Sequence, residues 1–289
     1  MIGWLVPELG RVEWREDLAE PIVGAGEVLV EVIAAAPNFA DRLVIDGTYQ
    51  ERIAPPFTPG IEVVGRVADR TVVGLTIPTR HGAWAERAAA RPGHLCDVPA
   101  GIHPVDALAV HTNAQTAWFA LHRRAEVRAG EVVQVHAAAG GVGSMALQLA
   151  VAHGCEVVAT SSAAKREVCL GLGARHWFDN RDPAWRTGVQ AAVGAVDVVV
   201  DPVGGSVFDE SVRALAFEGR IVTVGFASGE RPTLAVNRAL VRNVSLHGVY
   251  WTRYLTEDPS AVAAAAAEIF DHLAAGRIDP LITRRAAFA

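Results

Sequence analysis

The second part of the chain alternates short valine-rich runs with stretches of helical periodicity, and this alternation constrains the fold more than any other feature. The runs lack polar alternation, as do strands buried on both faces of a sheet. Repeated strand–helix units of this length predict an α/β fold with a doubly wound parallel sheet. Strands are expected at Val132–Val135, Glu156–Thr160, His176–Asp179, Val196–Asp201, Arg220–Gly225 and Val244–Val249. Helices are expected at Pro104–Val127, after the glycine turn that follows Val135, and at Ala163–Leu172, Pro183–Val193, Val207–Phe217 and Pro259–Ala275.

The first part of the chain, from Met1 to about Pro99, has a different pattern. Short β-type runs at Glu27–Ala35, Glu62–Val67 and Gly82–Ala90 are separated by Gly and Pro, and Tyr49–Gly60 is a Pro-rich loop. This pattern predicts an irregular, mostly β region. The change near residue 100 indicates two domains.

The composition excludes several classes of function. Apolar residues make up 51 % of the 289 residues, and the formal net charge is −6, which argues against nucleic acid or an anionic membrane as the main partner. Three scattered cysteines do not make a disulfide framework, and neither a secretory signal nor a membrane-spanning run is apparent. The expectation is a cytoplasmic globular protein.

A glycine turn links the strand at Val132–Val135 to the following helix. Glycines here let a phosphate approach the backbone, and the helix N-terminus attracts it. In the six-position dinucleotide pattern the three glycine positions hold Ala138, Gly140 and Gly143, so the first glycine is absent. Two glycines in such a turn also serve close packing alone. The position after the first strand of the sheet favours dinucleotide binding, for which the candidate residues are Ala139, Gly140, Gly141, Val142 and Gly143.

The end of the second strand indicates which dinucleotide is bound. NAD sites usually have Asp or Glu about 20 residues after the turn, to hold the ribose 2′-hydroxyl. This chain has Ser161 and Ser162 there, followed by its single lysine, Lys165. Hydroxyls, a helix N-terminus and an ammonium group suit a 2′-phosphate, which predicts NADPH. The alternative is a serine that caps a solvated helix.

Several segments in order resemble the quinone oxidoreductase (zeta-crystallin-like) branch of the medium-chain dehydrogenase/reductases. They are AAAGGVGSMALQLA from Ala137, DVVVDPVGG from Asp197, APNFADRLVIDGTY from Ala36 and PGIEVVGRV from Pro59. The resemblance implies a GroES-like β-barrel catalytic domain at 1–112 plus 245–289. It also implies an inserted Rossmann domain at 113–244.

The resemblance also allows the metal site of the zinc-dependent sister enzymes to be checked. The three ligand positions correspond to Asn38, Ile61 and Thr112, none of which is a plausible Zn²⁺ ligand. The local pair His94 and Cys96 lacks further ligands. No metal is therefore expected. Without a Lewis acid, hydride transfer to a quinone or an activated alkene (enone or enal) is a better interpretation of the reaction than alcohol oxidation.

The resemblance further implies the roles of individual residues. Tyr49 and Asn38 are candidates to stabilise the acceptor oxygen, although Tyr49 serves equally well as a loop anchor. Asp41 is expected to accept structural hydrogen bonds. The remaining cofactor-binding candidates are Thr116, beside the nicotinamide, Gly204 and Gly225, just after strand ends, and Phe226, through its backbone amide.

Three questions stay open at this level. The enzyme is expected to act on a small molecule, but an enoyl reductase of thioesters or natural-product intermediates, or a non-catalytic NADPH-binding protein, also fits. A homodimer is expected because the strand at Val244–Val249 would otherwise be an open edge, although Trp251 and Tyr254 after it suit a substrate cleft as well. The turn at 68–72 and the C-terminal segment are shorter than in the family. A natural deletion of a barrel strand would leave an unpaired sheet edge. Residues left out of the sequence are therefore the preferred explanation over a natural deletion.

Overall fold

The computed structural model describes residues 1–76 and 79–287. The chain divides into two compact units, each described by itself below. Unit 1 comprises Met1–Thr112, Asp258–Ala274 and Pro280–Ala289, and unit 2 comprises Asn113–Glu257 and Ala275–Asp279.

Unit 2 is built on a six-stranded parallel sheet with the strand order β10-β9-β8-β11-β12-β13. Chain order runs outward from β8 to β9 and β10 on one side and from β11 to β13 on the other, so the direction of winding reverses between β8 and β11. The strands are β8 (Val132–Val135), β9 (Glu156–Ser161), β10 (His176–Asp179), β11 (Val196–Asp201), β12 (Leu215–Thr223) and β13 (Ser245–Gly248). This is the predicted doubly wound Rossmann sheet.

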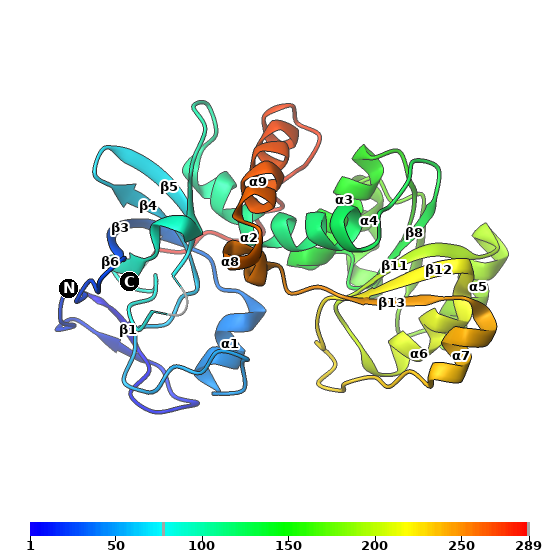
Figure 1. Cartoon of the computed structure of the whole chain (residues 1–289), viewed down its shortest axis with the longest axis horizontal. Coiled ribbons are helices and arrows are strands. Elements are labelled where there is room, and N and C mark those ends of the chain that lie inside the picture. Colours follow the sequence, from blue (N-terminus) through cyan, green and yellow to red (C-terminus); the bar gives the residue numbers. More distant parts are fainter. Residues whose placement is uncertain (77–78, 288–289) are drawn as a thin grey trace. The chain divides into compact units, whose positions relative to one another are not determined.

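Helices cover both faces of this sheet, which explains why its strands are apolar throughout. Figure 1 shows α3 and α4 on one side and α6 and α7 on the other. Val133, Val158 and Val199 of three neighbouring strands are completely buried. The helices of this unit are α3 (Gly141–Ala152), α4 (Arg166–Gly171), α5 (Trp185–Val193), α6 (Gly205–Ala214), α7 (Val236–Arg242) and α8 (Tyr254–Glu257).

The helix before β12 is shorter than the sequence predicts. The expected helix extended to Phe217, but α6 ends at Ala214 and Leu215 already pairs with Val196 as part of β12. A register shift follows, and Glu218 adopts a positive φ of 60°. Phe217 is 74 % exposed, so the apolar character that extended the predicted helix does not reflect burial here.

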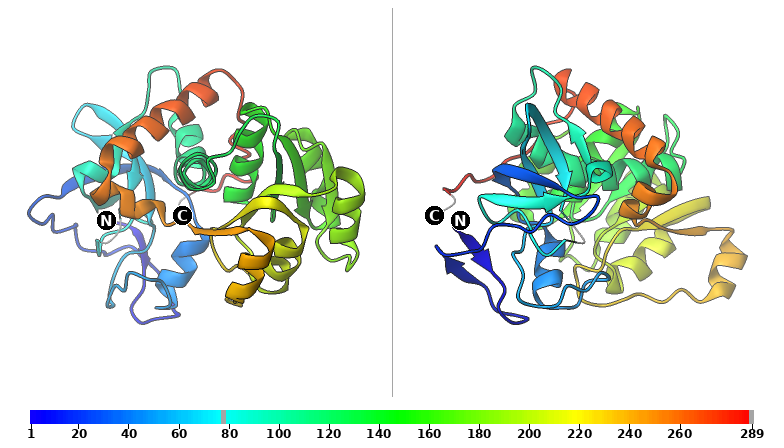
Figure 2. Two further views of the ribbon diagram at one scale, coloured as in Figure 1. Left: turned by 45° about the vertical axis from the view of Figure 1, so that its right-hand side comes forward. Right: turned by 60° about the vertical axis from the view of Figure 1, so that its left-hand side comes forward.

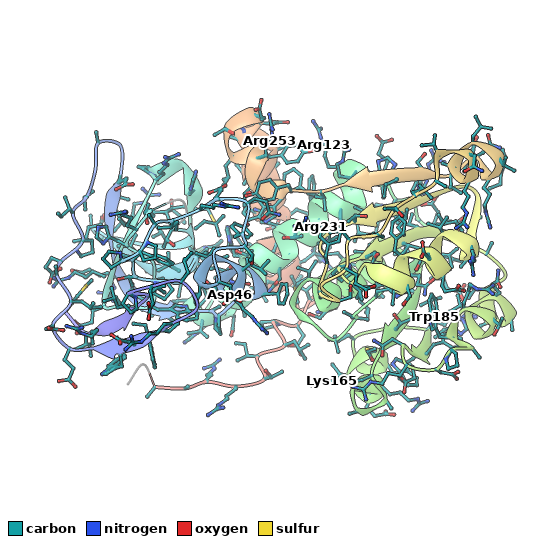
Figure 3. The ribbon with its side chains drawn as sticks, turned by 90° about the horizontal axis from the view of Figure 1, so that it is seen from below. Asp46, Arg123, Lys165, Trp185, Arg231 and Arg253 are labelled. Atoms are coloured by element: carbon teal, nitrogen blue, oxygen red, sulfur yellow. The ribbon has the colours of Figure 1, made fainter. Side chains whose placement is uncertain are left out.

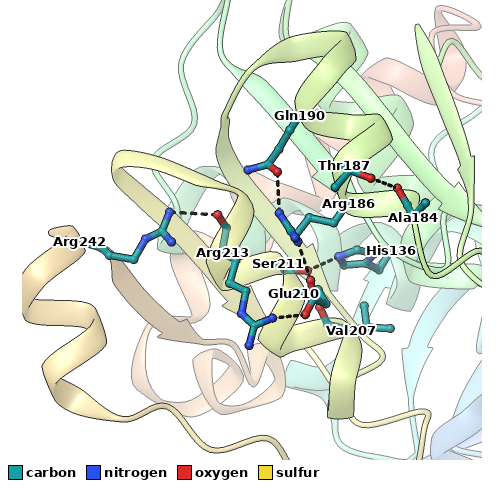
Figure 4. Close-up of polar contacts among 10 residues, drawn as sticks. All are labelled: His136, Ala184, Arg186, Thr187, Gln190, Val207, Glu210, Ser211, Arg213 and Arg242. Carbon is teal, nitrogen blue, oxygen red and sulfur yellow. Dashed lines mark hydrogen bonds and ion pairs between the residues drawn. The ribbon is translucent and has the colours of Figure 1, made fainter.

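A buried histidine connects the strands of unit 2 to α6. His136, directly after β8, has one ring nitrogen 2.6 Å from the hydroxyl of Thr160 and the other 2.6 Å from that of Ser211. Ser211 donates in turn to the carbonyl of Val207, so it accepts from His136 (Figure 4). Burial lowers the pKa of His136 to about 4. The imidazole is therefore a neutral link between β8, β9 and α6.

Unit 1 contains a five-stranded antiparallel sheet in the order β6-β3-β4-β5-β7 and a separate two-stranded ribbon, in keeping with the predicted GroES-like domain. The five strands are β3 (Val28–Ala35), β4 (Glu62–Val67), β5 (Arg70–Leu75), β6 (Arg87–Ala90) and β7 (Leu95–Asp97), and the ribbon is β1 (Gly3–Leu5) with β2 (Glu13–Arg15). Val30, Val63 and Ala88 form part of the buried cluster on this sheet. The two views of Figure 2 show how strongly its strands twist.

Three helices complete the description. α1 (Phe39–Ile45) follows β3, and α9 (Pro259–Ala274) returns to unit 1 from the end of the chain. α2 (Pro104–Trp118) crosses the boundary between the units at Thr112 and continues as a π-helical stretch over Phe119–Arg124. None of the helices in the described residues is long and apolar enough to cross a membrane.

The short connection between β4 and β5 closes a regular hairpin. Val67 pairs directly with Arg70, which leaves Ala68 and Asp69 as the turn. Ala68 has a φ of 54°, the left-handed conformation that two-residue hairpin turns need. The strands on either side of this turn are fully paired in register.

Candidate functional site: the C-terminal edge of the unit 2 sheet and a buried carboxylate in unit 1

The glycine turn after β8 exposes the N-terminus of α3. Gly140, the residue before α3, provides no capping side chain, and the first amides of an α-helix have no acceptor within it. Gly140 and Gly141 are both exposed. A helix N-terminus with accessible amides favours an anion, so this turn fits the pyrophosphate of a dinucleotide.

The two non-glycine candidates of this segment lie on either side of the exposed pair. Ala139 precedes Gly140, and Val142 is the second residue of α3; both are half-buried. Ser144 is the residue whose amide donates to the carbonyl of Gly140, at 2.8 Å. The amide of Val142 therefore belongs to the first turn of α3, ahead of that hydrogen bond. Val142 is suited to bind phosphate through its backbone rather than through its apolar side chain.

Two glycines of the turn pack closely against neighbouring residues, Gly143 against backbone atoms and Gly141 against a side chain. A Cβ on Gly143 would lie 2.2 Å from the carbonyl oxygen of Ala137, and one on Gly141 would lie 2.6 Å from Oδ1 of Asn113. The absence of side chains at these positions therefore holds α3 against the end of β8 and against α2. Asn113 did not emerge from the sequence, because no motif links it to a turn so much later in the chain.

The two serines at the end of β9, Ser161 and Ser162, have different roles. Ser161 is only 4 % exposed, accepts a hydrogen bond of 2.8 Å from the indole of Trp177, and donates to the carbonyl of Ser162. Its hydroxyl thus ties β9 to β10. Ser162 is half-buried and makes no capping hydrogen bond, although it occupies the capping position of the turn Ala163–Lys165.

Lys165 is exposed at the end of this turn, next to the first residue of α4. Figure 3 labels it at the margin of unit 2, away from Trp185 of the core. Ser162 and Lys165 therefore present a hydroxyl and an ammonium group just beyond β9.

The loops after β11 and β12 lie side by side. The buried carboxylate of Asp201 accepts hydrogen bonds from the amides of Val203 and Gly204 at 2.8 and 3.0 Å. Gly204 has a φ of 72°, and a Cβ on it would lie 3.2 Å from Cδ1 of Phe226. The amide of Ala227 donates to the carbonyl of Pro202 at 3.0 Å.

These loops share one edge of the sheet with the glycine turn. Gly225 packs against the same loop, since a Cβ on it would lie 3.5 Å from the carbonyl of Pro202. The strands are parallel, so their carboxyl ends meet at this edge, which includes the reversal point where doubly wound sheets bind ligands. The structure therefore brings together the residues that follow β8, β9, β11 and β12.

Thr116 belongs to the same unit through α2. It is half-buried and lies three residues after Asn113, so both side chains face the same side of the helix. Since Asn113 packs against Gly141, Thr116 lies on the side of α2 that faces the glycine turn.

The metal-ligand positions of the sister enzymes are replaced in unit 1 by a buried hydrogen-bond network. Glu62 is fully buried and accepts 2.8 Å hydrogen bonds from the side-chain amide of Asn38 and from the backbone amide of Thr112. Thus two of the three positions that would hold zinc instead donate to a carboxylate. Among the described residues, no three His, Cys, Asp or Glu side chains are grouped to hold a metal ion.

Asp41 accepts structural hydrogen bonds, as expected. The amides of Asn38 and Ile61 donate to it at 2.6 and 2.8 Å. Burial, opposed by these hydrogen bonds and reinforced by the charge of Glu62, raises the pKa of Asp41 to about 6. The two acids fix the segment before α1 to the start of β4.

The two catalytic candidates differ in what their side chains do within unit 1. The amide hydrogens of Asn38 are directed to Glu62 and, at 3.4 Å, to the carbonyl of Ala36. Tyr49 is half-buried, and its backbone amide donates to the carbonyl of Leu43 at 3.0 Å. The backbone of Tyr49 thus closes the loop after α1.

The aromatic residues after β13 line a shallow groove within unit 2. The groove measures about 290 Å³ and is bordered by Arg124, Gly248, Tyr250, Arg253, Tyr254 and Glu257. The ring of Tyr254 stacks on Phe119 with centroids 4.4 Å apart, whereas Trp251 is buried. Of the two aromatics considered from the sequence, only Tyr254 faces this groove.

Comparison with known proteins identifies similar families over both units. Residues 141–268 match the family described as zinc-binding dehydrogenase, and residues 24–77 match the alcohol dehydrogenase GroES-like domain. Quinone oxidoreductase-like protein 2 of Mus musculus is 34 % identical over 96 % of this chain and 82 % of its own. Prostaglandin reductase-3 of the same species is 31 % identical over 87 % and 71 % of the two chains.

A solved structure agrees with these matches. The quinone oxidoreductase of Thermus thermophilus, whose structures include a complex with NADPH, superimposes with a TM-score of 0.79 at 37 % identity. The match covers 93 % of this chain and 86 % of that one. The likeness therefore includes both the parallel sheet and the antiparallel one.

Proposed function

Since the chain belongs to the quinone oxidoreductase branch of the medium-chain dehydrogenase/reductase superfamily, we propose that it is a zinc-independent, NADPH-dependent reductase of quinones or activated alkenes. Membership of this superfamily makes the chain an oxidoreductase that uses a nicotinamide cofactor. The observation that carries this proposal is the edge of the unit 2 sheet, where the N-terminus of α3, Ser162 and Lys165 follow two adjacent strands. Bound there, NADPH supplies the hydride.

The residues of unit 2 hold different parts of the cofactor in this proposal. The backbone of Ala139–Gly143, including the amide of Val142, binds the pyrophosphate at the N-terminus of α3. Ser162 and Lys165 bind the 2′-phosphate, with Ser161 positioning the end of β9 from inside. The nicotinamide end is lined by Thr116, Gly204, Gly225 and Phe226.

The acceptor is proposed to be a molecule that takes hydride without a Lewis acid. Asn38, Ile61 and Thr112 offer no metal-ligand set, so negative charge that develops on the acceptor oxygen needs a protein donor. We assign this role to the hydroxyl of Tyr49. Asn38, whose amide hydrogens are directed to Glu62 and Ala36, is proposed to act by positioning this segment.

Steady-state assays with a panel of quinones, enones and enoyl thioesters test the function. NADPH oxidation by quinones or enones is the expected result, and Tyr49→Phe is expected to lower kcat about 100-fold, the usual effect of losing one oxyanion donor, with NADPH binding unchanged. Turnover of enoyl thioesters alone would move the assignment to the enoyl reductases. NADPH binding without turnover of any acceptor would leave a binding protein.

The partner of this chain is proposed to be a second copy, through the open edge of the unit 2 sheet. β13 pairs with β12 on one side and ends the sheet on the other. Large apolar side chains are exposed around it, at 49 % for Leu246 and 74 % for Leu240 of α7. An edge strand beside an apolar surface favours pairing with another edge.

Sedimentation is expected to give a species of twice 30.6 kDa. Leu240→Glu is expected to weaken the dimer at least about 100-fold, because a leucine buried at about 1.5–3 kcal/mol is lost twice in a symmetric interface. Ile22→Glu, at an 83 % exposed apolar position of unit 1, is the matched control. A monomeric wild-type protein at micromolar concentration would contradict the proposal.

A further inference from the structure

The groove after β13 contains charged and aromatic side chains that the proposed function does not use. It lies within unit 2, where Arg124 ends the π-helical stretch that follows α2. Arg253 precedes α8, and Tyr254 and Glu257 are the first and last residues of that helix. The volume of about 290 Å³ is close to the lower end for small-molecule sites, about 300 Å³. The groove is therefore large enough for one end of a small molecule.

Arg124 is anchored by the backbone at the end of β13. Its Nε donates to the carbonyl of Gly248 at 3.0 Å, and the residue is half-buried. Within the described part of the chain, no carboxylate pairs with this guanidinium. The two terminal nitrogens therefore keep their N–H donors, and such a pair of nitrogens can bind both oxygens of a carboxylate.

Arg253 adds a second guanidinium to the groove. It pairs with Glu257, one helical turn later, at 3.3 Å, and both side chains are more than half exposed. Exposed ion pairs contribute little to stability, so Arg253 can exchange this partner for a ligand. Two guanidinium groups and one carboxylate leave the groove with a single positive charge, in a chain whose formal net charge is −6. One carboxylate of a ligand neutralises that charge.

Tyr254 provides an aromatic wall beside these charges. Its ring stacks on the fully buried Phe119, with centroids 4.4 Å apart and an interplanar angle of 27°, which fixes its position. Tyr250, which is 39 % exposed, borders the same groove. Aromatic surface next to a guanidinium suits a molecule with an apolar body and a negative charge.

The groove adjoins the part of the sheet edge that is proposed to hold the nicotinamide. Gly248 pairs with Thr223 of β12, and the amide of Val249 donates to the carbonyl of Thr223 at 3.2 Å. Thr223 is two residues before Gly225. The groove therefore begins one strand away from the loop that lines the nicotinamide in the proposed function, at the same carboxyl edge of the sheet.

We propose that this groove selects the hydride acceptor by binding a carboxylate on it. The paired terminal nitrogens of Arg124 hold the two carboxylate oxygens, Arg253 adds its charge, and the apolar part of the acceptor lies against Tyr254. The inference rests on the proposed function and deepens it, because it names acceptors that carry a carboxylate as the preferred class. The carboxylate places the acceptor and takes no part in the hydride transfer.

Two quinones that differ in charge test this inference in the wild-type protein. A 1,4-naphthoquinone with a propionate side chain and the methyl ester of that compound share the same reacting ring. The acid is expected to have a KM at least about tenfold lower than the ester, the effect of one charge-assisted pair of hydrogen bonds, with similar kcat. Equal KM values, or a lower value for the ester, would overturn the inference and leave the reductase function intact.

Substitution of Arg124 tests the residue that carries the inference. Arg124→Gln is expected to raise KM for the acid about tenfold and to leave KM for the ester unchanged. Arg128→Gln, at an exposed arginine outside the groove, alters the net charge equally and should keep the preference. A merely structural role would change both KM values together, so a preference that persists in Arg124→Gln contradicts the inference. If Arg124→Gln does not fold, Arg253→Gln is expected to reduce the preference about threefold, and the wild-type comparison still decides.

Direct binding gives an answer even if no acceptor is reduced. Calorimetric titration of the protein, saturated with NADP⁺ to occupy the glycine turn, uses 3-(2-naphthyl)propionate as the probe. Binding is expected in the wild type and in Arg128→Gln, and about tenfold weaker binding in Arg124→Gln. This pattern without any turnover would refute the proposed reductase function alone and support the carboxylate site. No binding by the wild type, or equal binding by Arg124→Gln, would overturn the inference, whatever the reductase assays give.

Discussion

Gly143→Ala is expected to weaken NADPH binding at least about 100-fold and to lower the free energy of unfolding by about 1–3 kcal/mol. The new Cβ would lie 2.2 Å from the carbonyl oxygen of Ala137 and 2.8 Å from its carbon, so α3 must move away from the end of β8. That movement displaces the amides that would receive the pyrophosphate. Each hydrogen bond to a charged group contributes about 1.5–3 kcal/mol, and losing two accounts for the expected change.

Fluorescence titration with NADPH and urea unfolding measure the two effects. Gly171→Ala is the matched control, because Gly171 is also helical but a Cβ there meets nothing within 4 Å. That variant is expected to gain up to about 1 kcal/mol from helix propensity and to bind NADPH as the wild type does. Wild-type affinity in Gly143→Ala would refute the assignment of the glycine turn.

Lys165→Met is expected to raise KM for NADPH about 10- to 100-fold while leaving KM for NADH unchanged. The two cofactors differ only in the 2′-phosphate, and one charge-assisted hydrogen bond contributes about 1.5–3 kcal/mol. Methionine retains most of the apolar stem and removes the charge. Steady-state assays with both cofactors and one fixed acceptor provide the measurement.

Lys165→Arg controls for charge and is expected to retain most of the preference for NADPH. Ser162→Ala should add to the loss in Lys165→Met, since the hydroxyl of Ser162 makes no capping hydrogen bond. An equal loss for NADPH and NADH would place Lys165 outside the phosphate site.

The sheet of unit 2 could be predicted from the sequence because burial on both faces leaves a simple pattern. β8, β10 and β11 begin and end at the predicted residues, Val132–Val135, His176–Asp179 and Val196–Asp201. The glycine turn that opens α3 was predicted in the same way. Where the pattern failed, at Leu215–Phe217, apolar side chains continue from a helix into a strand and Phe217 is exposed, so hydrophobicity alone gave no boundary.

The side chains that assemble through tertiary contacts were not accessible in the same way. The hydroxyl of Ser161 donates a hydrogen bond to the carbonyl of Ser162. It accepts one from the indole of Trp177, which lies on the adjacent strand. Likewise, Asn38 was considered as a donor to the acceptor oxygen, whereas its side-chain amide is directed to Glu62 of β4. Such pairings depend on strand register and helix rotation, which local sequence does not determine.

The division of unit 1 along the chain has a consequence for its synthesis. α9, in which Val262, Ile269 and Phe270 are buried, belongs to the same unit as the β3–β7 sheet but follows residues 113–257 of unit 2 in the chain. At about 5–20 residues per second, translation of the 145 intervening residues, 113–257, takes about 7–30 s. During that time the nascent unit 1 lacks one of its own helices, so unit 1 completes its fold only after most of unit 2 has been synthesised.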